Sequence, residues 1–328
     1  MPFRRTVPVA LLLGLSLLFA ACGADGDAGE GTLVMATTSQ IGALAREVVG
    51  SEVLEGGETV EVATLLAPGV NPHDYEPSPA EVARLSRAAV VLRNGIGLDD
   101  FLDGAIAGAG VRHVVTVTDG IALRSTDRDA QDHDDDAEHG EHAEDDGHRH
   151  EGDLDPHVWH DPERVQVMVA NIADALAEAF PERAAAFRAN ADAYAQRLDE
   201  VDAEVRALLE TVPVEHRKVV SAHDSLGYFL DRYGLQFVGA VIPATASGAE
   251  ASVRALAELQ GLIEREGVRA IFAESSVDPR LVERLAEDTG VRVVTDLYSD
   301  TLGPEGSGAD TVDGMLLHNA RRIAEALR

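Results

Sequence analysis

The chain has 328 residues, 45% of them hydrophobic, so it can bury a sizeable core, and its length suggests about two domains. Its formal net charge at pH 7 is -31, and Lys218 is the only lysine. Nucleic-acid binding needs clusters of Lys and Arg against the phosphates, so this composition argues against a nucleic-acid partner.

The N-terminal segment has the pattern of an export signal. Arg4 and Arg5 precede an apolar stretch over residues 7–21, which is shorter than the ~20 residues that a membrane-spanning helix needs. The stretch ends in Leu-Phe-Ala-Ala-Cys, which resembles the lipobox of bacterial lipoproteins, with Phe19 in place of the usual Leu. We interpret residues 1–22 as a lipoprotein signal peptide ending at the lipidated Cys22, and an ordinary secretory signal is the alternative.

Cys22 is the only cysteine, and this limits the chemistry of the mature chain. It leaves no intrachain disulfide, and any metal site must use His, Asp or Glu. Residues 23–31 are small and acidic and predict a flexible tether. We therefore expect an exported protein, held by its lipid at the outer face of the cytoplasmic membrane or in the periplasm.

Short apolar runs alternate with helical patterns through the rest of the chain, which indicates a parallel α/β fold. The expected strands lie at 33–36, 60–66, 88–92, 111–117, 219–222, 237–242, 270–273 and 291–295. Helix starts are predicted by the capping box Ser-Pro-Ala-Glu at 78–81 and by the Asp-Pro pairs at 161–162 and 278–279.

An acidic, His-rich stretch interrupts this pattern at residues 125–152. Between residues 131 and 151 it holds ten Asp or Glu and five His, and no apolar residue larger than Ala. Such a segment cannot offset its ordering entropy by burial, so we expect a loop inserted into the N-terminal lobe. It is either an auxiliary low-affinity metal loop or a solvated insertion without a role. Its histidines are His133, His139, His142, His148 and His150.

Residues 182–210 predict one long helix. Apolar residues recur there at steps of three, four and seven, and no Gly or Pro interrupts them. A helix of this length extends about 40 Å, enough to join two lobes formed by residues 32–181 and 211–328. A strand of a coiled-coil dimer is the alternative, but the apolar seam is short for one, so we expect a monomer.

Polar side chains follow several of the predicted strands, and ligands bind at this edge of open parallel sheets. His73 comes after residues 60–66, His223 after 219–222 and Glu274 after 270–273, and Asp296 and Asp300 come after 291–295. His157 lies just before the helix expected at 162. Imidazole and carboxylate together suit Zn²⁺, so these residues predict a metal site where the lobes meet.

Four stretches, at 71–79, 155–162, 221–230 and 298–303, closely resemble the motifs of the cluster A-I metal-binding proteins, the solute receptors of zinc and manganese ABC transporters. The resemblance extends from residues 34–38 through Asn-Gly-Ile-Gly-Leu at 94–98 to the C-terminal helix. It implies two lobes, each a parallel sheet flanked by helices, joined by one long helix. It also implies a permease, and through it an ATPase, as partners.

Carried over onto this sequence, the family's metal ligands fall on His73, His157, His223 and Asp300. Manganese receptors of the family typically have Glu in place of His223, so the resemblance implies Zn²⁺ as the transported ligand, with manganese or iron as the alternative. Some zinc members have water at the fourth position, so water and Asp296 are alternatives to Asp300. Glu274 is expected to orient a ligating His, or else to form a structural ion pair. A long His-rich loop is typical of the zinc branch.

No enzyme class is favoured by the sequence. It has no His-Glu-x-x-His and no Gly-x-Ser-x-Gly, and no P-loop surrounds Lys218. Three His and one Asp would fill a tetrahedral zinc site, whereas a catalytic zinc keeps one position open. A surface adhesin is the remaining alternative. Because a ligating His must be neutral, we expect metal affinity to fall below about pH 6.

Overall fold

The structure is a computed structural model that describes residues 32–51, 59–66, 69–70, 72, 75–126, 154–242, 253–275 and 280–328. The expected signal peptide, Cys22 and the tether lie outside these residues. The five histidines of the acidic loop and His73 also lie outside them.

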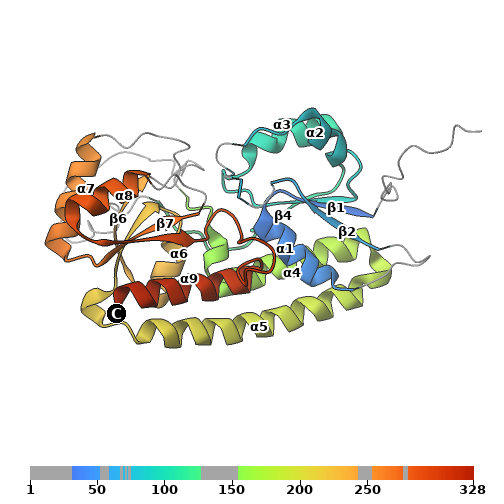
Figure 1. Cartoon of the computed structure of the whole chain (residues 1–328). Coiled ribbons are helices and arrows are strands. Elements are labelled where there is room, and N and C mark those ends of the chain that lie inside the picture. Colours follow the sequence, from blue (N-terminus) through green and yellow to red (C-terminus); the bar gives the residue numbers. More distant parts are fainter. Residues whose placement is uncertain are drawn as a thin grey trace, which may run out of the picture.

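Two four-stranded parallel sheets form two lobes (Figure 1). The strand order is β2-β1-β3-β4 in the N-terminal lobe and β6-β5-β7-β8 in the C-terminal lobe. Each of the eight apolar runs predicted as strands overlaps one of them, so the predicted fold class is confirmed. The strands are β1 Leu33–Ala36, β2 Glu61–Thr64, β3 Val90–Arg93, β4 Val114–Thr116, β5 Lys218–His223, β6 Gln236–Ile242, β7 Ala270–Glu274 and β8 Arg292–Leu297.

Helices flank both sheets, and local sequence explains where they start. Ser78 Oγ accepts a hydrogen bond from Glu81 N, and Glu81 Oε2 accepts one from Ser78 N, so the predicted capping box is formed. Asp161 caps the helix that begins at Pro162, also as predicted. The helices are α1 Ser39–Val49, α2 Pro79–Leu85, α3 Asp103–Ala109, α4 Pro162–Ala179, α5 Ala184–Glu210, α6 Gly227–Tyr233, α7 Val253–Glu266, α8 Arg280–Thr289 and α9 Val312–Leu327.

Alternate residues of each strand enter different cores, as the strand period of two requires. Val34 and Leu92 of the first sheet and Phe272 of the second belong to one large core, which α1, α4, α5 and α9 complete. The opposite faces of the sheets pack separately against α2 and α3 in the N-terminal lobe and against α7 and α8 in the C-terminal lobe. The two lobes therefore share one continuous hydrophobic core.

The predicted linking helix is α5, which has 27 residues and runs beneath both lobes (Figure 1). Its buried side includes Phe187, Tyr194, Leu198 and Val205, as the apolar spacing indicates. The helix packs along α4 and α9 and also contacts α1. In the described part of the chain, no helix is both long and apolar enough to cross a membrane.

Candidate metal centre

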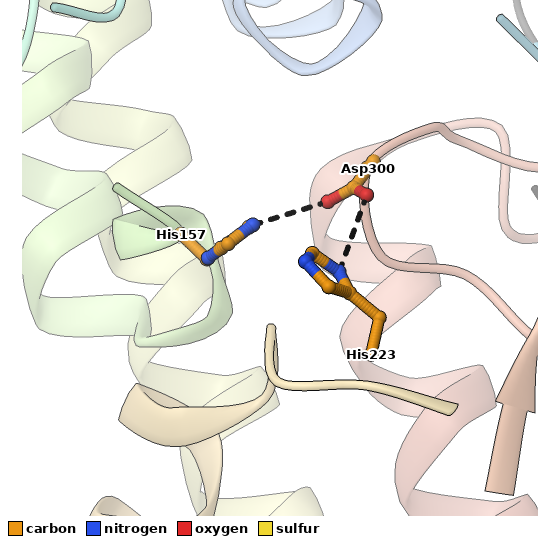
Figure 2. Close-up of side chains that lie close together, drawn as sticks. All are labelled: His157, His223 and Asp300. Atoms are coloured by element: carbon orange, nitrogen blue, oxygen red, sulfur yellow. Dashed lines mark ion pairs between the residues drawn. The ribbon is translucent and has the colours of Figure 1, made fainter. Parts of the chain in front are cut away.

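Two imidazoles and one carboxylate meet between the lobes (Figure 2). His157 belongs to the N-terminal lobe, His223 and Asp300 belong to the C-terminal lobe, and all three are buried. One candidate ligand atom from each lies within 4.8 Å of the others. His157 Nε2 is 3.3 Å from Asp300 Oδ1, and His223 Nδ1 is 3.5 Å from Asp300 Oδ2. The nitrogen and oxygen donors thus converge on one place where a divalent cation can bind.

Asp155 fixes the orientation of His157. Its Oδ1 accepts hydrogen bonds from the backbone N of His157 at 3.0 Å and from the ring Nδ1 at 2.7 Å. A carboxylate can only accept, so Nδ1 carries the proton of that bond, and with Nδ1 held by Asp155 the other ring nitrogen, Nε2, faces Asp300. Asn94 Nδ2 also donates to the carbonyl oxygen of Pro156 at 3.2 Å, which holds the intervening residue in place.

The residues after Asn94 form a tight turn, and this explains the Asn-Gly-Ile-Gly motif. Gly95 and Gly97 have φ values of 73° and 78°, in the left-handed region that glycine adopts without steric cost. Asp99 closes the turn by accepting bonds from the backbone N of Asn94 at 2.6 Å and of Gly95 at 2.8 Å. The motif therefore supports the segment that carries His157.

The loop after β8 carries Asp300, and residues of the N-terminal lobe hold it in place. The carbonyl oxygen of Ser299 accepts hydrogen bonds from Gln40 Nε2 at 2.8 Å and from Trp159 Nε1 at 2.9 Å. The buried Trp159 ring also lies edge-on to His157, with 5.4 Å between the ring centroids. The lobes are thus joined by hydrogen bonds directly beside the candidate ligands.

His223 and Glu274 end β5 and β7, which are neighbours in the second sheet. Parallel strands bring their carboxyl ends to one edge, so both side chains lie at the site. Glu274 is buried, and Ser225 Oγ donates to its Oε1 at 3.2 Å. Burial, and after it the charge of Asp300, raises the pKa of Glu274 to about 8.

Hydrogen bonding decides the charge of His157. Burial by itself lowers the pKa of this histidine, but its bonds to Asp155 and Asp300 outweigh burial and raise the pKa to about 10. At neutral pH the metal-free ring is therefore an imidazolium between two carboxylates. A cation that binds here takes the place of that proton.

His160 is a second buried histidine close to the site, at the end of the short 3₁₀ helix Val158–His160. Burial, together with the positive charge of His157, lowers its pKa to about 3, so it is neutral. Neither ring nitrogen has a hydrogen-bond partner among the described residues. As the sequence predicts, the helix start at Pro162 comes after it, and it is not part of the three-residue cluster.

The structure brings together three of the four predicted ligands, and His73 lies outside the described residues. Asp296, the alternative to Asp300, is an ion-pair partner of Arg322 at 2.9 Å and is not in the cluster. Sequence reasoning missed Asp155, although the pattern Asp-Pro-His at 155–157 is a signal for it, because a carboxylate two residues before a His can reach the ring.

Comparisons with known proteins agree on one family. The profile described as the periplasmic zinc-uptake complex component A matches residues 34–326. The zinc-binding protein TroA of Treponema pallidum is 32% identical over 331 residues, which cover 99% of this chain and 98% of TroA. The manganese-binding lipoprotein MntA of Halalkalibacterium halodurans is 29% identical over 326 residues, which cover 97% of each chain.

Solved structures show the same fold. The periplasmic zinc binding protein TroA from Treponema pallidum matches with a TM-score of 0.74 at 29% identity, covering 90% of this chain and 99% of that one. A manganese-bound periplasmic metal binding protein from Candidatus Liberibacter asiaticus matches with a TM-score of 0.72 at 20% identity, covering 90% and 100%.

Proposed function

We propose that this chain, which belongs to the family of the periplasmic zinc-uptake complex component A, captures Zn²⁺ outside the cytoplasm and delivers it to an ABC importer. Members of this family are metal-binding receptors rather than enzymes. The observation that carries the proposal is the cluster of His157, His223 and Asp300 between the lobes. A cation held by donors from both lobes links the two lobes to each other. The surface that the metal-bound receptor presents to a permease can therefore differ from that of the metal-free receptor.

His73 is the proposed fourth ligand, since it falls on the family's remaining ligand position. Three imidazoles and one carboxylate complete a tetrahedron and leave no position for a reacting water. Such a site binds its cargo without catalysing a reaction. Glu274 supports the site from beside His223, where its raised pKa keeps a second negative charge away from Asp300.

The donor set favours Zn²⁺ over Mn²⁺, because neutral imidazole suits the borderline-soft zinc ion better than the harder manganese ion. Manganese is the second candidate, and a specific observation supports it. Manganese-binding lipoproteins and a zinc-binding protein match this chain at similar identity, 29% for MntA and 32% for TroA. Family membership therefore leaves the choice of metal to the ligands themselves.

The remaining features fit an anchored receptor. Lipidation at Cys22 would hold the protein at the outer face of the membrane, within reach of a permease and, through it, its ATPase. Relatives of the chain include lipoproteins of ABC transporters, which is the same arrangement. The histidines at 133–150 act as a low-affinity collector in this scheme, and the receptor works as a monomer.

A competition titration tests the proposal. Purified metal-free protein is titrated with Zn²⁺ against a chromophoric chelator, and then with Mn²⁺ as the competitor. We expect zinc to bind at one tight site and manganese not to displace it. His223→Ala should lose tight binding, while deletion of residues 132–150 should retain it. Tight zinc binding by His223→Ala would refute the site, and displacement of zinc by manganese would refute the choice of metal.

A further inference from the structure

Arg124 connects the two lobes through Asp155, the residue that holds the ring of His157. Its Nη1 donates to Asp155 Oδ2 at 2.9 Å, and its Nε donates to Asp231 Oδ2 on α6, also at 2.9 Å. Asp155 uses its other oxygen, Oδ1, for the ring of His157. One guanidinium thus grips the carboxylate behind a metal ligand and, at the same time, the helix that follows His223.

The backbone around Arg124 repeats this link between the lobes. Tyr228, also on α6, accepts a bond from Arg124 N at 3.1 Å and donates one to the carbonyl oxygen of Asp155 at 2.9 Å. Asp155 N donates in turn to the carbonyl oxygen of Arg124 at 3.0 Å. Asp155 is therefore held at its side chain and its backbone by one arginine and one tyrosine.

Gly227 shows how closely α6 approaches this pair. A Cβ at Gly227 would lie 1.9 Å from Arg124 Nη1 and 2.7 Å from Asp155 Oδ2. No side chain fits there unless the guanidinium moves. The helix that follows His223 thus begins with a residue that leaves room for the Arg124–Asp155 ion pair.

We infer that Arg124 is a positioning residue for metal binding, which holds Asp155 against His157 and fixes that ligand relative to α6 in the other lobe. The inference rests on the proposed function and goes beyond it, because Arg124 touches neither the metal ligands nor the metal position. Arginine suits this place because its planar fork donates to two carboxylates in different directions, which a lysine ammonium cannot do with the same geometry.

The matched control is Arg164. Both arginines lie over the ring of Tyr228, Arg164 at 4.6 Å and Arg124 at 5.8 Å from its centroid, and Arg164 is likewise paired with a carboxylate, Asp161. Within the described residues, Arg164 donates to the carbonyl oxygen of Ala122 and to Asp161, and not to Asp155. The variants Arg124→Met, Arg124→Lys and Arg164→Met are compared with the wild type for zinc affinity and for the visible absorption spectrum of the Co²⁺-loaded protein.

Removing a group that supports a ligating His typically weakens metal binding by about 10- to 100-fold, and we expect Arg124→Met to fall near the lower end. Arg124→Lys should recover part of that loss, the Co²⁺ bands should shift in Arg124→Met, and Arg164→Met should match the wild type. In an Asp155→Asn background, Arg124→Met should cause no further loss. Wild-type zinc affinity in Arg124→Met, or an equal loss in the Asp155→Asn background, overturns the inference.

A measurement on the metal-free protein separates this inference from the proposed function. The ¹⁵N resonance of the His157 ring Nδ1 reports its hydrogen bond to Asp155 whether or not the protein binds zinc. We expect it to shift in Arg124→Met and not in Arg164→Met. If the wild type binds neither Zn²⁺ nor Mn²⁺, the proposed function fails, while this resonance still decides the role of Arg124: an unchanged resonance overturns it.

Discussion

Binding of a cation at this site should release a proton from His157. Burial alone would lower the pKa of this ring, but the bonds to Asp155 and Asp300 raise it to about 10 in the metal-free protein. An imidazole that ligates a metal must be neutral, so the cation and the proton compete for the ring. An ordinary histidine, with a pKa of about 6.5, would be only a few per cent protonated at about pH 8 and would release almost nothing.

The size of the effect follows from the pKa. Between about pH 7 and pH 9, each unit of pH should change the logarithm of the zinc association constant by about one, which is ~1.4 kcal/mol per unit. At pH 7 the competition should weaken binding by roughly 1,000-fold relative to a site with a neutral ring. The pH at which affinity begins to fall thus lies well above the value of about 6 that the sequence alone suggests.

Calorimetry in two buffers of different ionisation enthalpy measures the number of protons released. At about pH 8 we expect close to one proton per Zn²⁺ from the wild type, because a pKa of about 10 leaves the ring almost fully protonated there. The same titration of Asp155→Asn is the matched control, since that variant loses the carboxylate bond that raises the pKa of His157 and should release fewer protons. A release near zero at pH 8 would refute the reasoning.

Three further predictions concern stability and the contact between the lobes. Burial raises the pKa of Glu274 from 4.5 to about 8, so the protonated side chain stabilises the folded state fully below pH 4.5, and this stabilisation is lost as the pH rises through 8. Glu274→Gln has no such group to ionise. The substitution should therefore stabilise the metal-free protein, relative to the wild type, more and more between pH 4.5 and pH 8. Thermal unfolding in chelator at pH 5 and pH 8 measures this, and an equal shift at both would contradict it. Leu198→Ala, in the fully buried side of α5, should cost about 2–5 kcal/mol in urea unfolding, whereas Glu200→Ala on the exposed side should cost little. Gln40→Leu removes one of two donors to the Ser299 carbonyl, a loss of about 1 kcal/mol, and should speed zinc release several-fold in stopped-flow chelator chase; an unchanged rate would show that Trp159 suffices.

The sequence predicted the central strands well because β1, β3, β5 and β7 are almost entirely buried, so each is an apolar run that stands out from its neighbours. The long helix could also be predicted from burial, since its buried residues, among them Phe187, Tyr194 and Val205, repeat at helical spacing. Its start was placed two residues early, at 182, because a 3₁₀ turn over Pro181–Arg183 precedes α5. Helix ends depend on such local geometry more than on periodicity.

The ligands could be proposed from the sequence because His223 ends a strand and Asp300 follows one. Their convergence with His157 could not be derived from spacing, since it depends on how two sheets face each other across a shared core. Two of the groups that hold the ligands in place could not be predicted from the sequence. Arg124 and Gln40 lie in unremarkable local sequence, and they act through contacts with residues 31 and 259 positions away.

Trp159 is the only tryptophan in the chain, and it lies edge-on to His157 while donating to the residue before Asp300. Its indole is buried, so its emission depends on the neighbouring protein groups rather than on solvent. When a cation replaces the His157 proton, the charge beside this one fluorophore changes. The unlabelled protein therefore contains its own optical reporter, and metal capture and release can be followed in real time by its intrinsic fluorescence.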